Sequence, residues 1–328
     1  MLFIFSCGSK PPDKTSVSNT YYKNGQIRYS ITYKNNSIDG QFIEYFDNGQ
    51  VKTRGHYIND KKNGEWFTYY TTGELEQSQN YINGKLNGKW IYYSLNGSVK
   101  QDVDYKNGYK HGNYFRYDEK LNILSSRKYK NGNREGQWLS YFSNGQQKYE
   151  RNYQNGVEHG KWISYYKTGQ LKYKKTYKNG LEHGTTSIYY QNGQLEQLVN
   201  FSNGNKEGKW TYYYSDGKIW YEKNYKYAIE HGDYKEFYQN GQIKLNGIYE
   251  IGKKDGLWVS YYQNGNLMEK ITYKNGSYDG ENITYHNNGK FKSVGYWING
   301  KKDNLWAWYY KNGQLQEEVS YKDGDINW

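Results

Sequence analysis

The 328-residue sequence contains one cysteine, two prolines, two alanines and no run of 18 apolar residues. The single thiol, Cys7, excludes a disulfide within this sequence and a cysteine-based zinc site. The missing apolar run excludes a membrane-spanning helix. Leu, Ile and Val together supply only 45 residues, so an ordinary aliphatic core is excluded as well.

Aromatic side chains dominate in their place. Tyr, Trp and Phe make up 20% of the sequence, with 43 tyrosines, and 37 glycines are spread along the chain. The formal net charge is +12. The length alone suggests about two globular domains. This composition fits neither a disordered nor a helical protein.

Glycine recurs every 24 residues in three registers. The first register runs from Gly25 to Gly313, with Leu121 at its one vacant position. The second runs from Gly40 to Gly280 and the third from Gly84 to Gly324, and together the three registers hold 33 of the 37 glycines. An unbroken period of this length indicates a tandem repeat in which one unit is one supersecondary element.

Each repeat has the signals of a β-hairpin. Nine of the twelve glycines in the first register follow Asn, and Asn-Gly between aromatic segments predicts a type I′ turn. The flanking segments are rich in Trp, Tyr, Ile and Thr, which favour strands. We therefore predict an all-β fold: an elongated single-layer twisted antiparallel sheet of about 26 strands, built from thirteen 24-residue hairpin repeats over residues 18–328.

Trp and Tyr follow the same period, and side-chain alternation along a strand places the two series on opposite faces of the sheet. Aromatic side chains are common at the centres of protein interfaces. A structural role is the alternative for each ring, because a single-layer sheet has no other core. The candidate interaction surface comprises Trp66, Trp90, Trp138, Trp162, Trp210, Trp258 and Trp306, with Tyr69, Tyr93, Tyr141, Tyr165, Tyr213, Tyr261 and Tyr309.

The unit reads G-x-W-x-x-Y-Y-x-N-G-Q-L, then five variable residues, then Y-x-N-G. Over residues 18–328 this pattern resembles the variant class of MORN repeats, the bacterial kind often labelled as an antitoxin component. The resemblance implies a hairpin array with a binding role. Members of the broader family are associated with protein partners and, in some cases, with acidic phospholipid surfaces.

The N-terminus has features of a bacterial lipoprotein. Ile4-Phe5-Ser6-Cys7 looks like the end of a signal peptide whose lipidated residue is Cys7, although the apolar stretch is shorter than a complete signal. We predict a signal-peptide remnant over residues 1–7 and a flexible polar linker over residues 8–17. If Cys7 is acylated, it is the membrane anchor and the protein lies at the cell envelope, periplasmic or outer-membrane; an unmodified thiol predicts a cytoplasmic protein.

No catalytic or metal-binding constellation is evident. His111, His159, His183 and His231 share one register, but equivalent residues lie two strands, about 9.6 Å, apart, too far to share a zinc ion. Asp, Asn and Glu fill this register elsewhere, so we predict that it caps turns. The departures from the repeat, Leu121, Thr186, Ala228, Asn282 and Asn304, bring no nucleophile to a base. We therefore expect neither an enzyme nor a cofactor.

The partner is predicted from surface chemistry alone. An aromatic and basic surface favours a non-enzymatic scaffold that binds a protein. The alternatives are an antitoxin or immunity protein that neutralises a toxin, and a binder of acidic lipid or cell-wall polymer surfaces. Nucleic acid is a weaker alternative, because the basic residues form no dense stripe.

Overall fold

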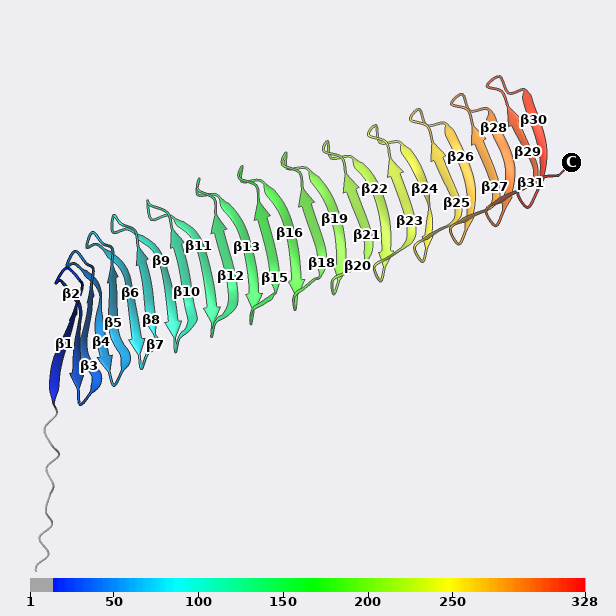
Figure 1. Ribbon diagram of the computed structural model, residues 1–328. Coiled ribbons are helices and arrows are strands. Elements are labelled where there is room, and N and C mark those ends of the chain that lie inside the picture. Colours follow the sequence, from blue (N-terminus) through cyan, green and yellow to red (C-terminus); the bar gives the residue numbers. More distant parts are fainter. Residues whose placement is uncertain (1–13, 328) are drawn as a thin grey trace, which may run out of the picture. The chain divides into compact units, whose positions relative to one another are not determined.

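The computed structural model describes residues 14–327, which form 31 strands and no helix (Figure 1). No helix in this range is long and apolar enough to cross a membrane. Cys7 and the predicted signal remnant lie outside the described residues, and the first strand begins at Thr15, inside the range predicted as a linker. The chain divides after Val157 into two compact units, here called unit 1 and unit 2.

Unit 1 contains the first thirteen strands. They are β1 (Thr15–Tyr21), β2 (Ile27–Lys34), β3 (Ser37–Tyr45), β4 (Val51–Ile58), β5 (Lys61–Tyr69), β6 (Leu75–Ile82), β7 (Lys85–Leu86), β8 (Gly88–Tyr93), β9 (Val99–Lys106), β10 (Tyr109–Tyr117), β11 (Ile123–Lys130), β12 (Asn133–Tyr141) and β13 (Gln147–Gln154). The two-residue strand β14 (Val157–Glu158) lies at the division between the units.

Unit 2 contains the remaining strands. They are β15 (Gly160–Tyr165), β16 (Leu171–Lys178), β17 (Leu181–Glu182), β18 (Gly184–Tyr189), β19 (Leu195–Ser202), β20 (Asn205–Lys206), β21 (Gly208–Tyr213), β22 (Ile219–Lys226), β23 (Ile229–Phe237), β24 (Ile243–Glu250), β25 (Lys253–Tyr261), β26 (Leu267–Lys274), β27 (Ser277–Tyr285), β28 (Phe291–Ile298), β29 (Lys301–Tyr309), β30 (Leu315–Lys322) and β31 (Asp325–Ile326).

Successive long strands pair antiparallel within each unit, as β5 does with β6 and β25 with β26. The prediction of an all-β antiparallel sheet built from hairpin repeats is confirmed. The strand number exceeds the predicted 26 mainly because four strands are each interrupted by one residue, at Asn87, His159, His183 and Glu207. At these points a bulge splits one expected strand into a short and a longer piece.

Two kinds of turn alternate along the chain. In the Y-x-N-G connection both central residues have positive φ, as at Asn83 (50°) and Gly84 (78°), which is a type I′ turn. In the turns of the first register only the glycine has a positive φ, as at Gly193 (88°). There Asn192 accepts a hydrogen bond from the Gln194 N–H at 3.0 Å, within a three-residue loop. The type I′ assignment of the first register was therefore wrong, although both connections form hairpins.

Indole rings lie directly on the backbone of neighbouring strands. Trp258 is 1% exposed and packs between Tyr249 and Tyr273, with ring centroids 5.1 and 6.1 Å away. A Cβ atom on Gly247 would lie 2.2 Å from Cδ2 of this indole. The ring N–H donates to the Ile248 carbonyl at 3.2 Å. The glycine inside strand β24 therefore makes room for the indole, which takes the place of a second layer.

Candidate functional site

The sheet has two chemically different faces. On the tryptophan face, the Trp66 ring lies 5.0 Å from the Tyr57 ring. On the opposite face, called the tyrosine face, the Arg54 guanidinium lies 5.1 Å from the Phe67 ring and 5.6 Å from the Tyr69 ring. Residues 24 apart occupy equivalent positions on neighbouring hairpins. The two predicted aromatic series therefore lie on opposite faces.

Most of the tryptophan series is buried. Only Trp90 and Trp162 are half-buried, whereas five members are nearly inaccessible: Trp66, Trp138, Trp210, Trp258 and Trp306. Four of these rings pack against tyrosine or phenylalanine rings of neighbouring strands with centroids between 5.0 and 6.2 Å apart, and Trp306 packs against Trp297 at 5.2 Å. They hold strands together and offer little surface to a partner.

Cations cover several of these indoles. Lys62 Nζ lies 3.9 Å from the Trp66 ring centroid, and Lys254 Nζ lies 4.2 Å from that of Trp258. Lys206 occupies the same register. Burial lowers the pKa of Lys62 and of Lys254. Part of the chain's positive charge thus stabilises the aromatic packing through cation–π contacts.

The predicted tyrosine series is half-buried throughout: Tyr69, Tyr93, Tyr141, Tyr165, Tyr213, Tyr261 and Tyr309. On the same face, the residues beside the Tyr series differ between units. In unit 1 the positions facing solvent are polar, for example Glu65, Lys89 and Gln137 in one register and His56 and Asp104 in another. In these two registers the tyrosine face of unit 1 is therefore polar, whereas a third register on the same face carries the half-buried apolar residues Phe67, Ile91, Phe115 and Leu139.

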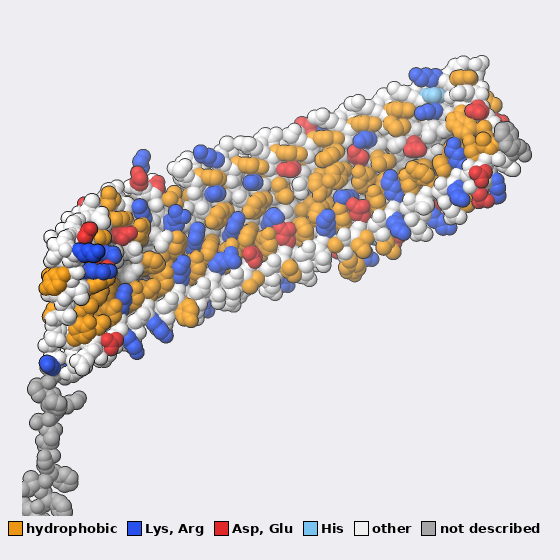
Figure 2. All heavy atoms as spheres, viewed as in Figure 1, with side chains coloured by type: hydrophobic (Ala, Val, Ile, Leu, Met, Phe, Trp, Pro, Cys, Tyr) orange, Lys and Arg blue, Asp and Glu red, His pale blue; other side chains and the backbone are white. Residues whose placement is uncertain are grey.

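In unit 2 four positions of these two registers are apolar and form an apolar patch, which Glu281 interrupts between Leu257 and Leu305. Leu257 and Leu305 are 53% and 55% exposed, and Ile248 and Tyr296 are 48% and 40% exposed. The patch comprises Ile248, Leu257, Val259, Ile283, Val294, Tyr296, Leu305 and Ala307, which all point to the tyrosine face of strands β24, β25, β27, β28 and β29. Val259 and Ala307 are buried beneath its exposed members. Figure 2 shows hydrophobic side chains gathered over strands of each unit, with Lys and Arg among them.

A column of rings follows the first-register turns and is called the turn column. Its hydroxyls donate to a carbonyl one hairpin further along, as Tyr166 does to the Tyr189 carbonyl and Tyr214 to that of Phe237, at 2.8 and 2.9 Å. Ser94 and Asp118 interrupt it. The column otherwise comprises Tyr22, Phe46, Tyr70, Phe142, Tyr166, Tyr190, Tyr214, Tyr238, Tyr262, His286 and Tyr310.

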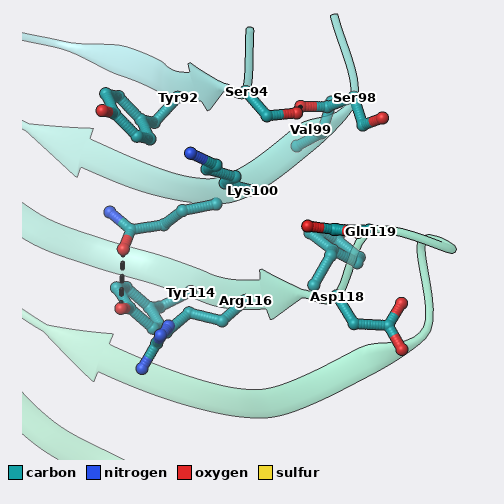
Figure 3. Close-up of a pocket in the computed structure, with 11 residues that line it drawn as sticks. Tyr92, Ser94, Ser98, Val99, Lys100, Tyr114, Arg116, Asp118 and Glu119 are labelled. Carbon is teal, nitrogen blue, oxygen red and sulfur yellow. Dashed lines mark hydrogen bonds between the residues drawn. The ribbon is translucent and has the colours of Figure 1, made fainter. Parts of the chain in front are cut away.

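A cleft of about 470 Å³ opens where the turn column is interrupted (Figure 3). Its wall includes Tyr92, Lys100, Tyr114 and Arg116, and the Tyr114 hydroxyl donates to Gln101 Oε1 at 2.8 Å. A second cleft, of about 520 Å³, lies on the other side of the irregular turn at residues 118–122. Both clefts belong to unit 1.

The histidine register caps turns at His111 and His183, as predicted, whereas His159 Nδ1 is buried without a hydrogen-bond partner among the described residues and His231 lies beside Glu250. Nδ1 of His111 accepts from the Asn131 N–H at 3.3 Å, and Asp255 accepts from the Asn275 N–H at 3.0 Å. Each acceptor thus stabilises a positive-φ residue 20 positions later. Over residues 14–327 no group of three His, Cys, Asp or Glu side chains is placed to hold a metal ion.

Comparison with protein families supports this geometry. Eleven segments match the description MORN repeat variant: residues 16–35, 38–59, 62–83, 86–107, 134–155, 158–179, 182–203, 206–227, 230–250, 254–275 and 302–323. Together they cover well over half of the sequence. The chain belongs to the MORN repeat variant family. MORN repeats form scaffolds for binding, and the repeat that carries the irregular turn at residues 118–122 lies outside the matched segments.

Three solved structures resemble this MORN repeat chain at low identity. A TcdB2–TccC3–Cdc42 complex shares 12% identity over 94% of this chain and 18% of that chain, with a TM-score of 0.19. The Photorhabdus luminescens Tc holotoxin pore with a TccC3 mutation shares 14% identity over 95% of this chain and 16% of that chain, with a TM-score of 0.18. TcdB2–TccC3 shares 12% identity over 94% of this chain and 19% of that chain, with a TM-score of 0.13. The chain spans less than a fifth of each. No curated protein matches.

Two features of the structure were not predicted from the sequence. Gly55, Gly247 and Gly295 each lie beneath an indole, and they stand outside the three glycine registers, eleven residues before a tryptophan. The interruption of the turn column was visible as Ser94 and Asp118 in a register otherwise filled by rings. Both signals are departures from the repeat.

Proposed function

We propose that this MORN repeat chain is a scaffold that binds a protein partner through the apolar patch of unit 2. The observation that carries the proposal is the exposure of Ile248, Leu257, Tyr296 and Leu305 at positions that are polar in unit 1. Exposed apolar side chains clustered on one surface mark interaction sites, because burying them against a partner removes them from water.

The neighbouring rings extend the same surface. Phe291 is exposed and lies 5.4 Å from the Tyr285 ring and 6.1 Å from the Tyr309 ring. Tyrosines that are half-buried lose little conformational freedom on binding and contribute strongly to interfaces. Within this proposal, Tyr261 and Tyr309 contact the partner, whereas the buried tryptophans support the strands.

Photo-crosslinking tests the proposal. A photoreactive phenylalanine is placed at Leu257 and, as a matched control, at Gln137, which occupies the same register in unit 1. We expect one protein to crosslink from position 257 and not from position 137. Leu257→Lys combined with Leu305→Lys should weaken capture of that protein at least about tenfold. Equal crosslinking from both positions would contradict the proposal.

The cellular setting is a separate proposal. Acylation of Cys7 would hold the scaffold at the bacterial envelope, and mass spectrometry of the native N-terminus tests it. A crosslinked toxin would favour the immunity role. Binding to anionic vesicles that is abolished by salt would favour a surface-binding role through the excess of Lys and Arg.

A further inference from the structure

The cleft of unit 1 lacks a ring that other repeats supply. In a regular repeat the Tyr166 hydroxyl donates to the Tyr189 carbonyl at 2.8 Å, and Lys172 Nζ lies 5.6 Å from the Tyr166 ring centroid. Arg28 and Lys148 lie over the rings of their own repeats in the same way, each 5.6 Å from the centroid. Tyr22 and Tyr166 are therefore each held by a carbonyl at the hydroxyl and a cation near the ring. Other members of the column, such as Tyr70 and Tyr190, have a glutamate at the cation position.

The equivalent carbonyl and the equivalent cation are both present in the repeat that lacks the ring. Ser94 replaces the tyrosine, and its hydroxyl hydrogen-bonds locally to Asn96 and to the Ser98 carbonyl. The equivalent carbonyl, that of Tyr117, receives no side-chain donor among the described residues and belongs to a residue that lines the cleft. The equivalent cation, Lys100, lies 5.6 Å from the Tyr92 ring centroid instead.

We propose that this cleft binds a phenolic ring, as a tyrosine side chain of a partner or as a free phenol. The ring enters the vacant position of the turn column beside Ser94, its hydroxyl donates to the Tyr117 carbonyl, and Lys100 covers its face. Neither contact depends on the apolar patch of unit 2, so the two sites are separable by experiment.

The size and polarity of the cleft fit this ligand. A volume of about 470 Å³ accommodates an aromatic ring with its first linking atoms. The Asp118 carboxylate does not compete for Lys100, because it accepts hydrogen bonds from the Lys120 and Asn122 N–H groups at 2.9 and 2.8 Å. Arg116 and Glu119 also line the cleft with opposite charges, so the lining favours no ligand of one charge.

Saturation-transfer NMR with the full chain tests the site. The probes are N-acetyltyrosinamide, N-acetylphenylalaninamide and p-cresol. We expect millimolar binding of the two phenols and binding of the phenylalanine derivative several-fold weaker, because only a hydroxyl reaches the carbonyl. A tyrosine derivative that binds more tightly than p-cresol indicates a partner's side chain, and equal binding indicates a free phenol.

Two variants and one control locate the binding. Ser94→Tyr refills the column and should abolish phenol binding, and Lys100→Met should weaken it several-fold. Lys172→Met is the matched control, since Tyr166 already fills its site, and should leave binding unchanged. Unaltered phenol binding by the folded Ser94→Tyr variant, or equal binding of the tyrosine and phenylalanine derivatives, would overturn the proposal.

Discussion

Units 1 and 2 share one repeat and differ in what they expose. On its tyrosine face unit 1 is polar in the registers of Glu65 and His56, and its turn column is interrupted at Ser94 and Asp118. In unit 2 every position of the turn column from Tyr166 to Tyr310 carries a ring, and Leu257 and Leu305 add exposed apolar side chains to its tyrosine face. Positions that obey the repeat build the sheet, so the positions that depart from it are where the units acquire separate binding properties.

Alkaline pH should produce the largest difference between the units. Burial raises the pKa of Tyr177, Tyr221, Tyr234 and Tyr273 in unit 2 well above the usual value of 10, and that of Tyr234 reaches about 12. In unit 1 a comparable pKa, about 12, belongs to Tyr70. Above pH 10 the unfolded chain loses these protons while the folded chain keeps them, so stability is complete below pH 10 and falls as pH rises.

We therefore expect unit 2 to lose its stability more steeply than unit 1 between pH 10 and pH 12. Hydrogen exchange, corrected for the intrinsic effect of pH and read separately for amides of each unit, measures the difference. An equal loss of protection in both units would show that these tyrosines are not buried as described.

Removal of a buried indole should cost more than removal of a half-buried one, and Trp258 of unit 2 and Trp90 of unit 1 provide the comparison. Trp258→Ala deletes a ring that is 1% exposed and should cost about 3–5 kcal/mol. Trp90→Ala deletes a half-buried ring whose N–H donates to Gln77 Oε1 at 3.2 Å, and should cost about 1–3 kcal/mol. Because repeats couple mainly to their neighbours, protection should be lost first in the hairpins beside each site. If the two variants lose the same free energy of unfolding, burial of the indole does not determine how much it stabilises the sheet.

The glycine beneath the indole gives a smaller effect of the same origin. Gly247→Ala places a Cβ atom 2.2 Å from the Trp258 ring, so the indole must move, at about 1–3 kcal/mol. In unit 1, Gln79→Ala at the same register removes side-chain atoms and should cost less. Chemical denaturation followed by tryptophan fluorescence measures both. An unchanged stability of Gly247→Ala would show that the indole has another place to pack.

The repeat made the hairpins and the alternation of faces predictable, because both depend on local periodicity. The conformations of the two kinds of turn could not be predicted, because Asn-Gly occurs in both. They differ in loop length, which in the first register is set by Asn192 and its hydrogen bond to Gln194. Burial of the Trp series depends on contacts across strands, including the glycine at position 247. The apolar patch required knowing which residues of distant repeats share a face.

The smallest effect is expected for a variant that restores the missing ring to the turn column of unit 1. Ser94→Tyr gives unit 1 the hydroxyl donor that Tyr190 provides in unit 2, where its hydroxyl donates to the Tyr213 carbonyl at 2.8 Å, and a ring beside Lys100, as Tyr166 lies beside Lys172. One hydrogen bond and one exposed cation–π contact should stabilise unit 1 by about 0.5–1.5 kcal/mol. Tyr190→Ser should destabilise unit 2 by a similar or greater amount, because it also removes buried ring surface. Urea denaturation read by hydrogen exchange in each unit compares the two variants. If Ser94→Tyr destabilises unit 1, the neighbouring turn at Asp118 has closed the space, and the vacancy in the turn column is not a ring-shaped site.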